Sequence, residues 1–160
     1  MLIGIMQGRL LPKVNNQFQA FPGVKWKDEF ILASKIGLDL IEFIFDEVDI
    51  NDNPLLNKKG LDGIIESSFL NGIVVRSVCA DYFMKFPLYE LSGSKNLDLM
   101  KLLINNCKYI GVKEIVLPFV DKSKLDSIKK INDLIYNLNN LKKILQDSDV
   151  TICLETDLTY

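Results

Sequence analysis

The 160-residue chain contains no histidine, the most frequent general base of enzymes and the commonest metal ligand. A Ser-His-Asp or Cys-His catalytic pair and a histidine-bearing zinc site are therefore excluded within these residues. Only three cysteines are present, Cys79, Cys107 and Cys153, and they lie far apart in the sequence. An odd and scattered set is typical of reduced thiols and not of a disulfide framework, so we expect a cytoplasmic protein.

The chain also lacks an excess of charge and long apolar runs. Its 19 Lys and Arg residues stand against 21 Asp and Glu, and no basic run is present that could follow a phosphate backbone. No stretch approaches the roughly 20 apolar residues of a membrane span, and the apolar start at residues 1–6 is too short for a secretory signal. We expect neither nucleic acid nor a membrane as partner. The 48% of hydrophobic residues suffice for a single domain with a core, residues 1–160.

A repeated turn divides the chain. An amphipathic helical run precedes, and a β-rich run follows, each of the triplets Ile36-Gly37-Leu38, Asn71-Gly72-Ile73 and Ile110-Gly111-Val112. Glycine just past a helix adopts the left-handed conformation that ends it, and the spacing of the triplets matches one βα unit. The predicted strands, which are short and rich in Ile, Leu and Val, are residues 2–6, 40–43, 74–80, 114–117 and 150–155. Strands that alternate with helices in this way form a parallel sheet with the helices outside.

A doubly wound sheet and an incomplete (β/α)8 barrel both satisfy this pattern. If Glu155 points to the inside, Cys153 and Thr151 do so too, because side chains alternate along a strand, and Glu42 likewise turns its neighbours outward. Polar or small residues inside suit a barrel, and no G-x-G-x-x-G follows the first predicted strand to support a dinucleotide fold. We therefore predict an α/β fold of the (β/α)8 TIM-barrel type. It is incomplete, with about four and a half βα units of the eight in a barrel of about 250 residues.

Polar residues stand where predicted strands end. The carboxyl ends of parallel barrel strands form one rim, so we expect Gln7, Glu42, Asp81 and Glu155 to converge there. A polar residue after a strand is often only a turn former, but a glutamate within apolar neighbours is costly to bury without a partner. We predict that Gln7, Arg9, Glu42 and Asp81 bind substrate, with the Arg9 guanidinium available for a phosphate or carboxylate.

Aromatic residues near these positions are candidates for the wall of a pocket above the rim, although packing of the loops explains them equally well. They are Phe18, Phe21, Trp26, Tyr82, Phe83 and Phe86. Cys79 has no histidine beside it that could make a thiolate, so we interpret it as a small apolar filler.

Six segments together resemble the sugar phosphate isomerase/epimerase family, the xylose isomerase-like TIM barrels that share a superfamily with endonuclease IV (AP endonuclease family 2). They are 5–10 (IMQGRL), 19–22 (QAFP), 37–42 (GLDLIE), 77–84 (SVCADYFM), 117–121 (LPFVD) and 154–158 (LETDL). The resemblance is collinear from Met1 to the final residues and covers the N-terminal part of a family member.

The resemblance implies an eight-stranded barrel with one divalent metal ion (Mn, Mg, Zn or Co), held by carboxylates and a histidine from strands five to eight. Glu155 matches the strand-five glutamate, which binds the metal and moves a proton. It also implies a sugar or sugar phosphate substrate, a ketose or polyol derivative, isomerised or epimerised through an enediolate. The other ligands have no positions here. We therefore expect this chain to be inactive alone and to self-associate through open sheet edges at residues 2–6 and 150–156.

Two other functions fit the sequence. The first is a non-catalytic half-barrel that binds a small ligand or assembles with another chain. The presence or absence of downstream coding sequence distinguishes it from the isomerase or epimerase. An endonuclease IV-type DNA repair enzyme would need several histidines, including some within the early strands. The absence of histidine and the net charge of -2 argue against that enzyme.

Overall fold

The computed structural model describes residues 1–14, 16–17, 19–48, 50–90 and 94–157. A five-stranded sheet is formed by β1 (Gly4–Met6), β2 (Leu40–Ile44), β3 (Val74–Cys79), β4 (Glu114–Phe119) and β5 (Thr151–Thr156). The strands lie in chain order and every pair is parallel. All five predicted strands are confirmed, with ends that differ by one or two residues. β4 runs on through Pro118 to Phe119, because these residues stay in register with Glu155 and Thr156 of β5.

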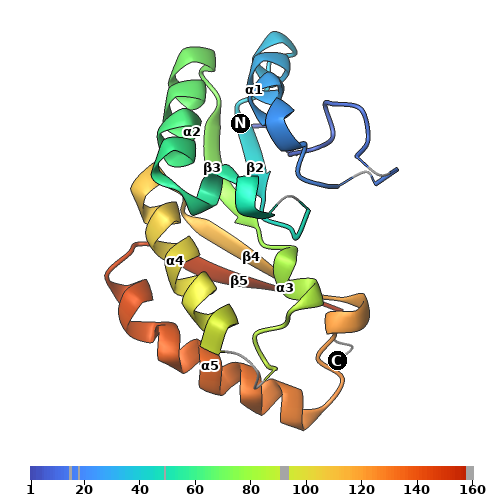
Figure 1. The fold of residues 1–160 in the computed structure, drawn as a ribbon, viewed down its shortest axis with the longest axis vertical. Helices are drawn as coiled ribbons and strands as arrows, with labels where there is room; N and C mark the ends of the chain where they lie inside the picture. The colour runs from blue at the N-terminus through green and yellow to red at the C-terminus, as the bar shows by residue number, and fades with distance from the viewer. Residues whose placement is uncertain (15, 18, 49, 91–93, 158–160) are drawn as a thin grey trace.

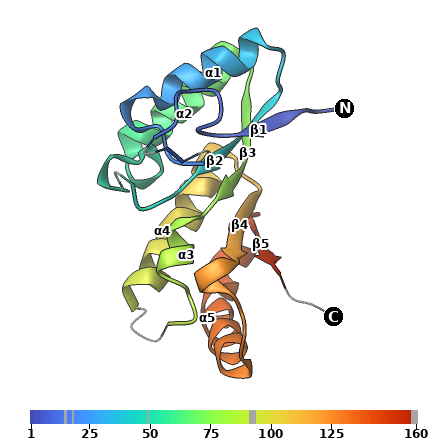
Figure 2. The same cartoon turned by 90° about the vertical axis from the view of Figure 1, so that its right-hand side faces the viewer.

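The longer helices lie on one face of this sheet (Figure 1). They are α1 (Trp26–Lys35), α2 (Lys58–Asn71), α4 (Ser94–Ile110) and α5 (Ile128–Gln146). The connecting segments contain the short helix α3 (Tyr82–Lys85) and the 3-10 turns η1 (Gly23–Lys25), η2 (Ile50–Asp52), η3 (Pro54–Leu56) and η4 (Asp121–Ser123). Seen from the side, the opposite face of the sheet carries no long helix from the described residues (Figure 2). This arrangement confirms an incomplete (β/α)8 barrel.

The core lies between the sheet and its helices. Ile41 and Phe43 of β2 are fully buried beneath them, whereas Glu42 between these residues is partly exposed on the other face. The expected alternation along β2 is therefore confirmed. Phe30 of α1 and Met100 of α4 are buried to the same extent. Each such side chain contributes about 1.5–3 kcal/mol by leaving water.

The helix-to-strand turns follow the predicted glycine pattern. Gly72 ends α2 with φ 68°, and its N–H donates to the Ser68 carbonyl. Gly37 and Gly111 also have positive φ values, of 78° and 82°. Glycine adopts this left-handed conformation without the clash that a Cβ brings, so the three triplets work as chain reversals.

The two edges of the sheet are open. Within the described residues, β1 pairs only with β2, and β5 only with β4. Apolar side chains are exposed beside both edges: Leu2 and Ile3 at 64% and 49%, and Leu154 at 45%. Ile152, on the same face of β5 as Leu154, still packs against the core, so the helical cover ends between these two residues.

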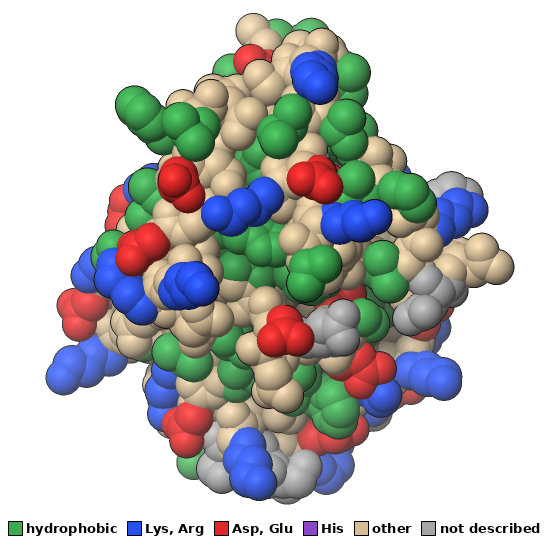
Figure 3. Space-filling view, turned by 45° about the horizontal axis from the view of Figure 1, so that its top comes forward, with side chains coloured by type: hydrophobic (Ala, Val, Ile, Leu, Met, Phe, Trp, Pro, Cys, Tyr) green, Lys and Arg blue, Asp and Glu red, His purple; other side chains and the backbone are tan. Residues whose placement is uncertain are grey.

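Exposed apolar side chains also gather where the strands begin. Phe69 and Leu70 of α2 are 85% and 71% exposed, and Val74 of β3 is 54% exposed. Figure 3, turned so that the top of Figure 1 comes forward, shows hydrophobic side chains at the upper margin and in the central hollow, with charged side chains between them. None of the helices in the described part of the chain is long and apolar enough to cross a membrane.

Candidate functional site

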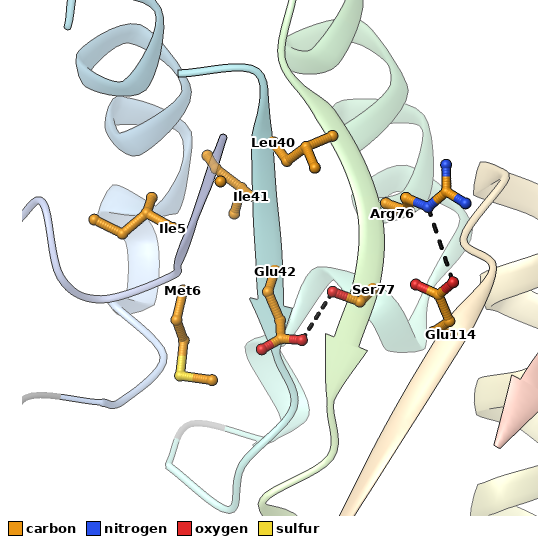
Figure 4. Close-up of a pocket in the computed structure, with 9 residues that line it drawn as sticks. Ile5, Met6, Leu40, Ile41, Glu42, Arg76, Ser77 and Glu114 are labelled. Carbon is orange, nitrogen blue, oxygen red and sulfur yellow. Dashed lines mark hydrogen bonds and ion pairs between the residues drawn. The ribbon is translucent and has the colours of Figure 1, made fainter. Parts of the chain in front are cut away.

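The open face of the sheet carries a row of polar side chains. The register aligns Glu42 of β2 with Ser77 of β3, and Ser77 with Glu114 of β4. The Ser77 hydroxyl donates to Glu42 Oε1 at 2.8 Å, and Arg76 Nε lies 3.9 Å from Glu114 Oε1 (Figure 4). Arg76 and Ser77, which are neighbours on β3, both line one cavity of about 290 Å³ on this face. The register between β2 and β3 shifts at the same place, between Ile41 and Glu42. This cavity is the interior of the half barrel.

Three of the predicted carboxylates raise the pKa of one thiol, that of Cys79. Cys79, at the end of β3, is 2% exposed, and its Sγ donates to Asp81 Oδ1 at 3.1 Å. Burial raises the pKa of this thiol, and the negative charges of Asp81, Glu42 and Glu155 raise it further. Since these carboxylates come from three strands or their ends, the structure brings them to the same interior face, and Cys79 stays a neutral thiol among them. That matches the predicted role of Cys79 as a filler.

Asp81 is also tied to the loop after β1. Gln19 Nε2 donates to Asp81 Oδ2 at 2.9 Å, and Arg9 Nη2 donates to Gln19 Oε1 at 3.5 Å. Two of the predicted substrate-binding residues, Arg9 and Asp81, are thus connected through a glutamine to which the sequence reasoning gave no role. Gln19 lies within the QAFP segment of the family resemblance, which was the available signal.

Gln7 lies inside the wall and not on its exposed rim. Its side chain is 1% exposed, and Gln7 Oε1 accepts a hydrogen bond from the Ile44 N–H at 3.0 Å. Its backbone N–H donates to the Glu42 carbonyl at 2.9 Å. Gln7 Nε2 has no partner among the described residues. The contacts of Gln7 therefore join β1 to β2, and substrate binding by Gln7 stays a prediction.

Two buried carboxylates that the sequence reasoning missed hold the loops of the rim. Glu29 of α1 is 0% exposed and accepts hydrogen bonds from the Gly8 N–H at 2.7 and 2.9 Å and from the Leu10 N–H at 3.2 Å. Burial raises the pKa of Glu29, although these N–H groups oppose the shift. Glu29 sits in the first turn of an amphipathic helix, where an acidic residue is ordinarily a solvated one that favours the helix dipole. Nothing local therefore signalled its role.

Asp46 is the second anchor. It is 9% exposed and accepts hydrogen bonds from the Phe21 N–H at 2.9 Å and the Val48 N–H at 3.1 Å. Burial raises the pKa of Asp46, and the charge of Asp81 adds to that shift. Asp46 follows the end of β2 just as Asp81 follows the end of β3, so the strand-end rule applied to Asp81 would have found it.

Three of the six aromatic candidates are core residues. Phe21 and Phe83 are 0% exposed and Trp26 is 9% exposed, and the Phe21 ring lies 6.2 Å from that of Phe43. Tyr82 lines a cavity and contacts Phe86, with ring centroids 4.8 Å apart. Phe18 lies outside the described residues. The packing interpretation therefore holds for three of them, and Tyr82 is the aromatic residue that reaches a cavity.

Glu155 stands near the carboxyl end of β5, exposed and in register with Pro118. The described residues form no hydrogen bond or ion pair with its side chain. Over the same residues, no group of three or more His, Cys, Asp or Glu side chains is placed to hold a metal ion. Because a bound divalent ion needs several ligands, the residues present do not fit a complete metal site, and Glu155 supplies a single carboxylate.

Comparison with known proteins gives matches in structure and none in sequence. Neither the protein-family models nor the curated proteins contain a match to the chain. The crystal structure of D-psicose 3-epimerase in the presence of D-fructose matches 96% of the chain with TM-score 0.69 and 15% identity. A xylose isomerase domain protein from Planctomyces limnophilus matches 99% with TM-score 0.67 and 11% identity. The IolI protein with a binding zinc atom matches 98% with TM-score 0.63 and 20% identity.

These matches define the class of fold, a parallel βα barrel of which this chain forms a continuous part. The chain spans about half the length of the matched proteins, 52%, 55% and 51% respectively. Its fold is that of the N-terminal half of a xylose isomerase-like TIM barrel.

Proposed function

We propose that this half-barrel belongs to an isomerase or epimerase of sugars, in which Glu155 is the proton-transfer carboxylate and a metal ligand. The observation that supports this most is the position of Glu155 at the carboxyl end of the fifth strand of such a barrel, with its side chain exposed and without a partner among the described residues. Active sites of these barrels lie at the carboxyl ends of the strands.

The chemistry assigned to the chain follows from its carboxylates. The Glu155 carboxylate removes a proton from the carbon next to a substrate carbonyl, which leaves an enediolate, and the carboxylic acid so formed returns the proton on the same face to the neighbouring carbon. Epimerisation would need a second acid that donates a proton to the opposite face of the enediolate. Asp81 is oriented by Gln19, and Glu42 by Ser77, so both present fixed acceptors for substrate hydroxyl groups. Because the residues present do not complete a metal site, no step is assigned to an ion.

The first experiment is to sequence the reading frame that follows residue 160, and to express whatever protein it encodes. We expect roughly another 100 residues or more, with Asp, His and Glu at successive strand ends. The whole protein should then interconvert ketoses such as D-fructose and D-psicose when a divalent metal is present. Glu155→Gln should lower the rate about 10²–10⁴-fold, the range for loss of a general base.

The matched control is Glu66→Gln on the outside of α2, where the Glu66 side chain is 63% exposed. It should leave the rate unchanged. The 160-residue chain alone should show no turnover. Metal-dependent turnover by the chain alone, or full activity of Glu155→Gln in the whole protein, would contradict the proposal.

Assembly without catalysis is a second candidate, and the unpaired edges of β1 and β5 favour it. An exposed strand edge carries N–H and C=O groups that pair readily with another chain. If a stop codon follows residue 160 directly, we expect oligomers of the purified chain in light scattering. A stable monomer over a wide range of concentration would rule assembly out.

A further inference from the structure

A second cavity, of about 180 Å³, lies at the carboxyl ends of β2 and β3. It shares no lining residue with the interior cavity beside Glu42 and Ser77. Three segments form its walls: the loop after β1, the segment after β2, and the segment after β3 that begins α3. The residues that matter for its chemistry are Gln17, Gln19, Asp46, Glu47, Asp81, Tyr82 and Lys85. Asp81 joins the two regions, because its Oδ1 contacts Cys79 on the interior face.

The walls of this cavity are held in place before any ligand arrives. Gln19 is fixed by its 2.9 Å hydrogen bond to Asp81, and Asp46 by the N–H groups of Phe21 and Val48 at 2.9 and 3.1 Å. The Tyr82 ring packs against three aromatic rings, with centroids at 5.6 Å (Phe45), 5.3 Å (Phe83) and 4.8 Å (Phe86). A preformed site loses little entropy when it binds a small molecule.

Unused hydrogen-bonding groups remain in the walls. Neither the Tyr82 hydroxyl nor the Gln17 side-chain amide has a hydrogen-bond partner among the described residues. Both groups donate as well as accept, which matches the hydroxyl groups of a polyol. An aromatic face beside polar groups is typical of the sites that orient small ligands.

The negative charge of the cavity favours an unphosphorylated ligand over a phosphorylated one. Asp46, Glu47 and Asp81 supply three carboxylates, and the cation in the lining is Lys85. Lys85 Nζ is already paired with Glu47 Oε2 at 2.6 Å. Arg9 contacts Gln19 at 3.5 Å but does not line the cavity. A phosphate placed here would be repelled by the uncompensated carboxylates, whereas a neutral polyol would not.

We propose that this cavity is a subsite for the unphosphorylated, hydroxyl-bearing end of a sugar, bound through Gln17, Gln19, Asp81 and Tyr82. The sugar class rests on the proposed function, while the preference for a neutral end rests on the charges of the cavity.

The test is a titration of the ¹⁵N-labelled 160-residue chain, followed by amide chemical shifts, with D-fructose and separately with D-fructose 6-phosphate. D-fructose should shift the amides of Gln17, Val48 and Tyr82 and the side-chain amide of Gln19. D-fructose 6-phosphate should bind at these residues about tenfold more weakly or not at all. Equal shifts by both sugars, shifts confined to the interior face around Ser77, or no shifts at all would each overturn the subsite.

Two substitutions test the named groups without disturbing the fold. Tyr82→Phe keeps the packed ring and Gln17→Ala changes an exposed side chain, and each should weaken D-fructose binding about threefold to tenfold, as expected for one hydrogen bond. Tyr136→Phe, on the exposed face of α5 at 66% exposure, is the matched control and should bind as the parent does. Unchanged binding by both Tyr82→Phe and Gln17→Ala would contradict the proposal.

Binding and turnover separate this inference from the proposed function. A chain that binds D-fructose at Tyr82, within a whole protein that converts no ketose, would keep the subsite and refute the isomerase. If the whole protein converts ketoses but D-fructose shifts no amide at Tyr82, the isomerase is supported and the subsite is refuted.

Discussion

The rim of the half barrel is built differently at its two ends. At β1 to β3, Gly8, Gln19, Asp46 and Asp81 are held by hydrogen bonds, with Glu29 buried beneath them; we call these five residues the anchored rim. At β5, Glu155 is exposed and has no partner among the described residues, and we call this position the bare end. Within the described residues, hydrogen bonds therefore fix the side chains of the rim at β1 to β3, whereas the Glu155 side chain at β5 is not fixed by any such contact.

Among substitutions that test this difference between the two ends, Gly8→Ala should lower the unfolding free energy most. Gly8 has φ +85°, and a Cβ there would lie 2.4 Å from the Ala20 carbonyl oxygen. Strain and overlap together should cost about 3–5 kcal/mol of unfolding free energy, measured by urea denaturation. Gly37→Ala is the matched control, because Gly37 has φ +78° with nothing within 4 Å, and it should cost only about 1–2 kcal/mol. Equal losses in the two variants would show that the anchored rim is not tightly packed.

Glu29→Ala should have the next largest effect. It leaves the N–H groups of Gly8 and Leu10 without their acceptor inside the protein, which should cost about 2–4 kcal/mol in the same assay. Glu66→Ala on the exposed side of α2 removes only a surface ion pair of 3.4 Å and should stay within about 0.5 kcal/mol of the parent. If both substitutions were neutral, Glu29 would not be an anchor.

The pH dependence of stability sharpens the comparison further. Burial raises the pKa of folded Glu29 above the ordinary value of 4.5, so the folded state holds its proton more tightly than the unfolded chain does. The stabilisation that follows is fully present below pH 4.5 and is lost as the pH rises through the folded pKa. Relative to Glu29→Gln, which has no carboxyl group there to titrate, the parent should therefore gain unfolding free energy as the pH falls through this window. If the unfolding free energy of the parent, relative to that of Glu29→Gln, rose with increasing pH instead, the pKa of folded Glu29 would be lowered and not raised.

The smallest effect should come from the bare end. Glu155→Gln removes a charge from an exposed side chain without a partner among the described residues, so the unfolding free energy should change by less than about 0.5 kcal/mol. A loss above about 1 kcal/mol in urea denaturation would mean that Glu155 is held as firmly as Glu29, and the contrast between the two ends would disappear.

The elements of the fold were predictable because their signals are local. Glycines at 37, 72 and 111 mark the ends of three helices. The alternation of apolar and polar side chains around Glu42 indicates which side of β2 faces the helices. The carboxylates at the strand ends were predictable for the same reason, since the order of parallel strands brings Glu42, Asp81 and Glu155 to one face.

The contacts that hold the rim were not predictable from such signals. Glu29 binds backbone groups 19 and 21 residues earlier in the chain, and Gln19 binds Asp81 across 62 residues. A glutamine after a strand has the same local pattern whether it faces a ligand or, like Gln7, the backbone of the next strand. Only the folded geometry distinguishes these cases.

The position of Cys79 has a consequence for oxidative chemistry. Peroxides and other oxidants attack the thiolate form of cysteine, and burial together with three surrounding carboxylates keeps this sulfur protonated. The acidic groups proposed to handle the sugar would thus also protect the sulfur at their centre from conversion to sulfenic acid. The Cys79 sulfur should therefore react slowly with peroxide as long as the chain stays folded.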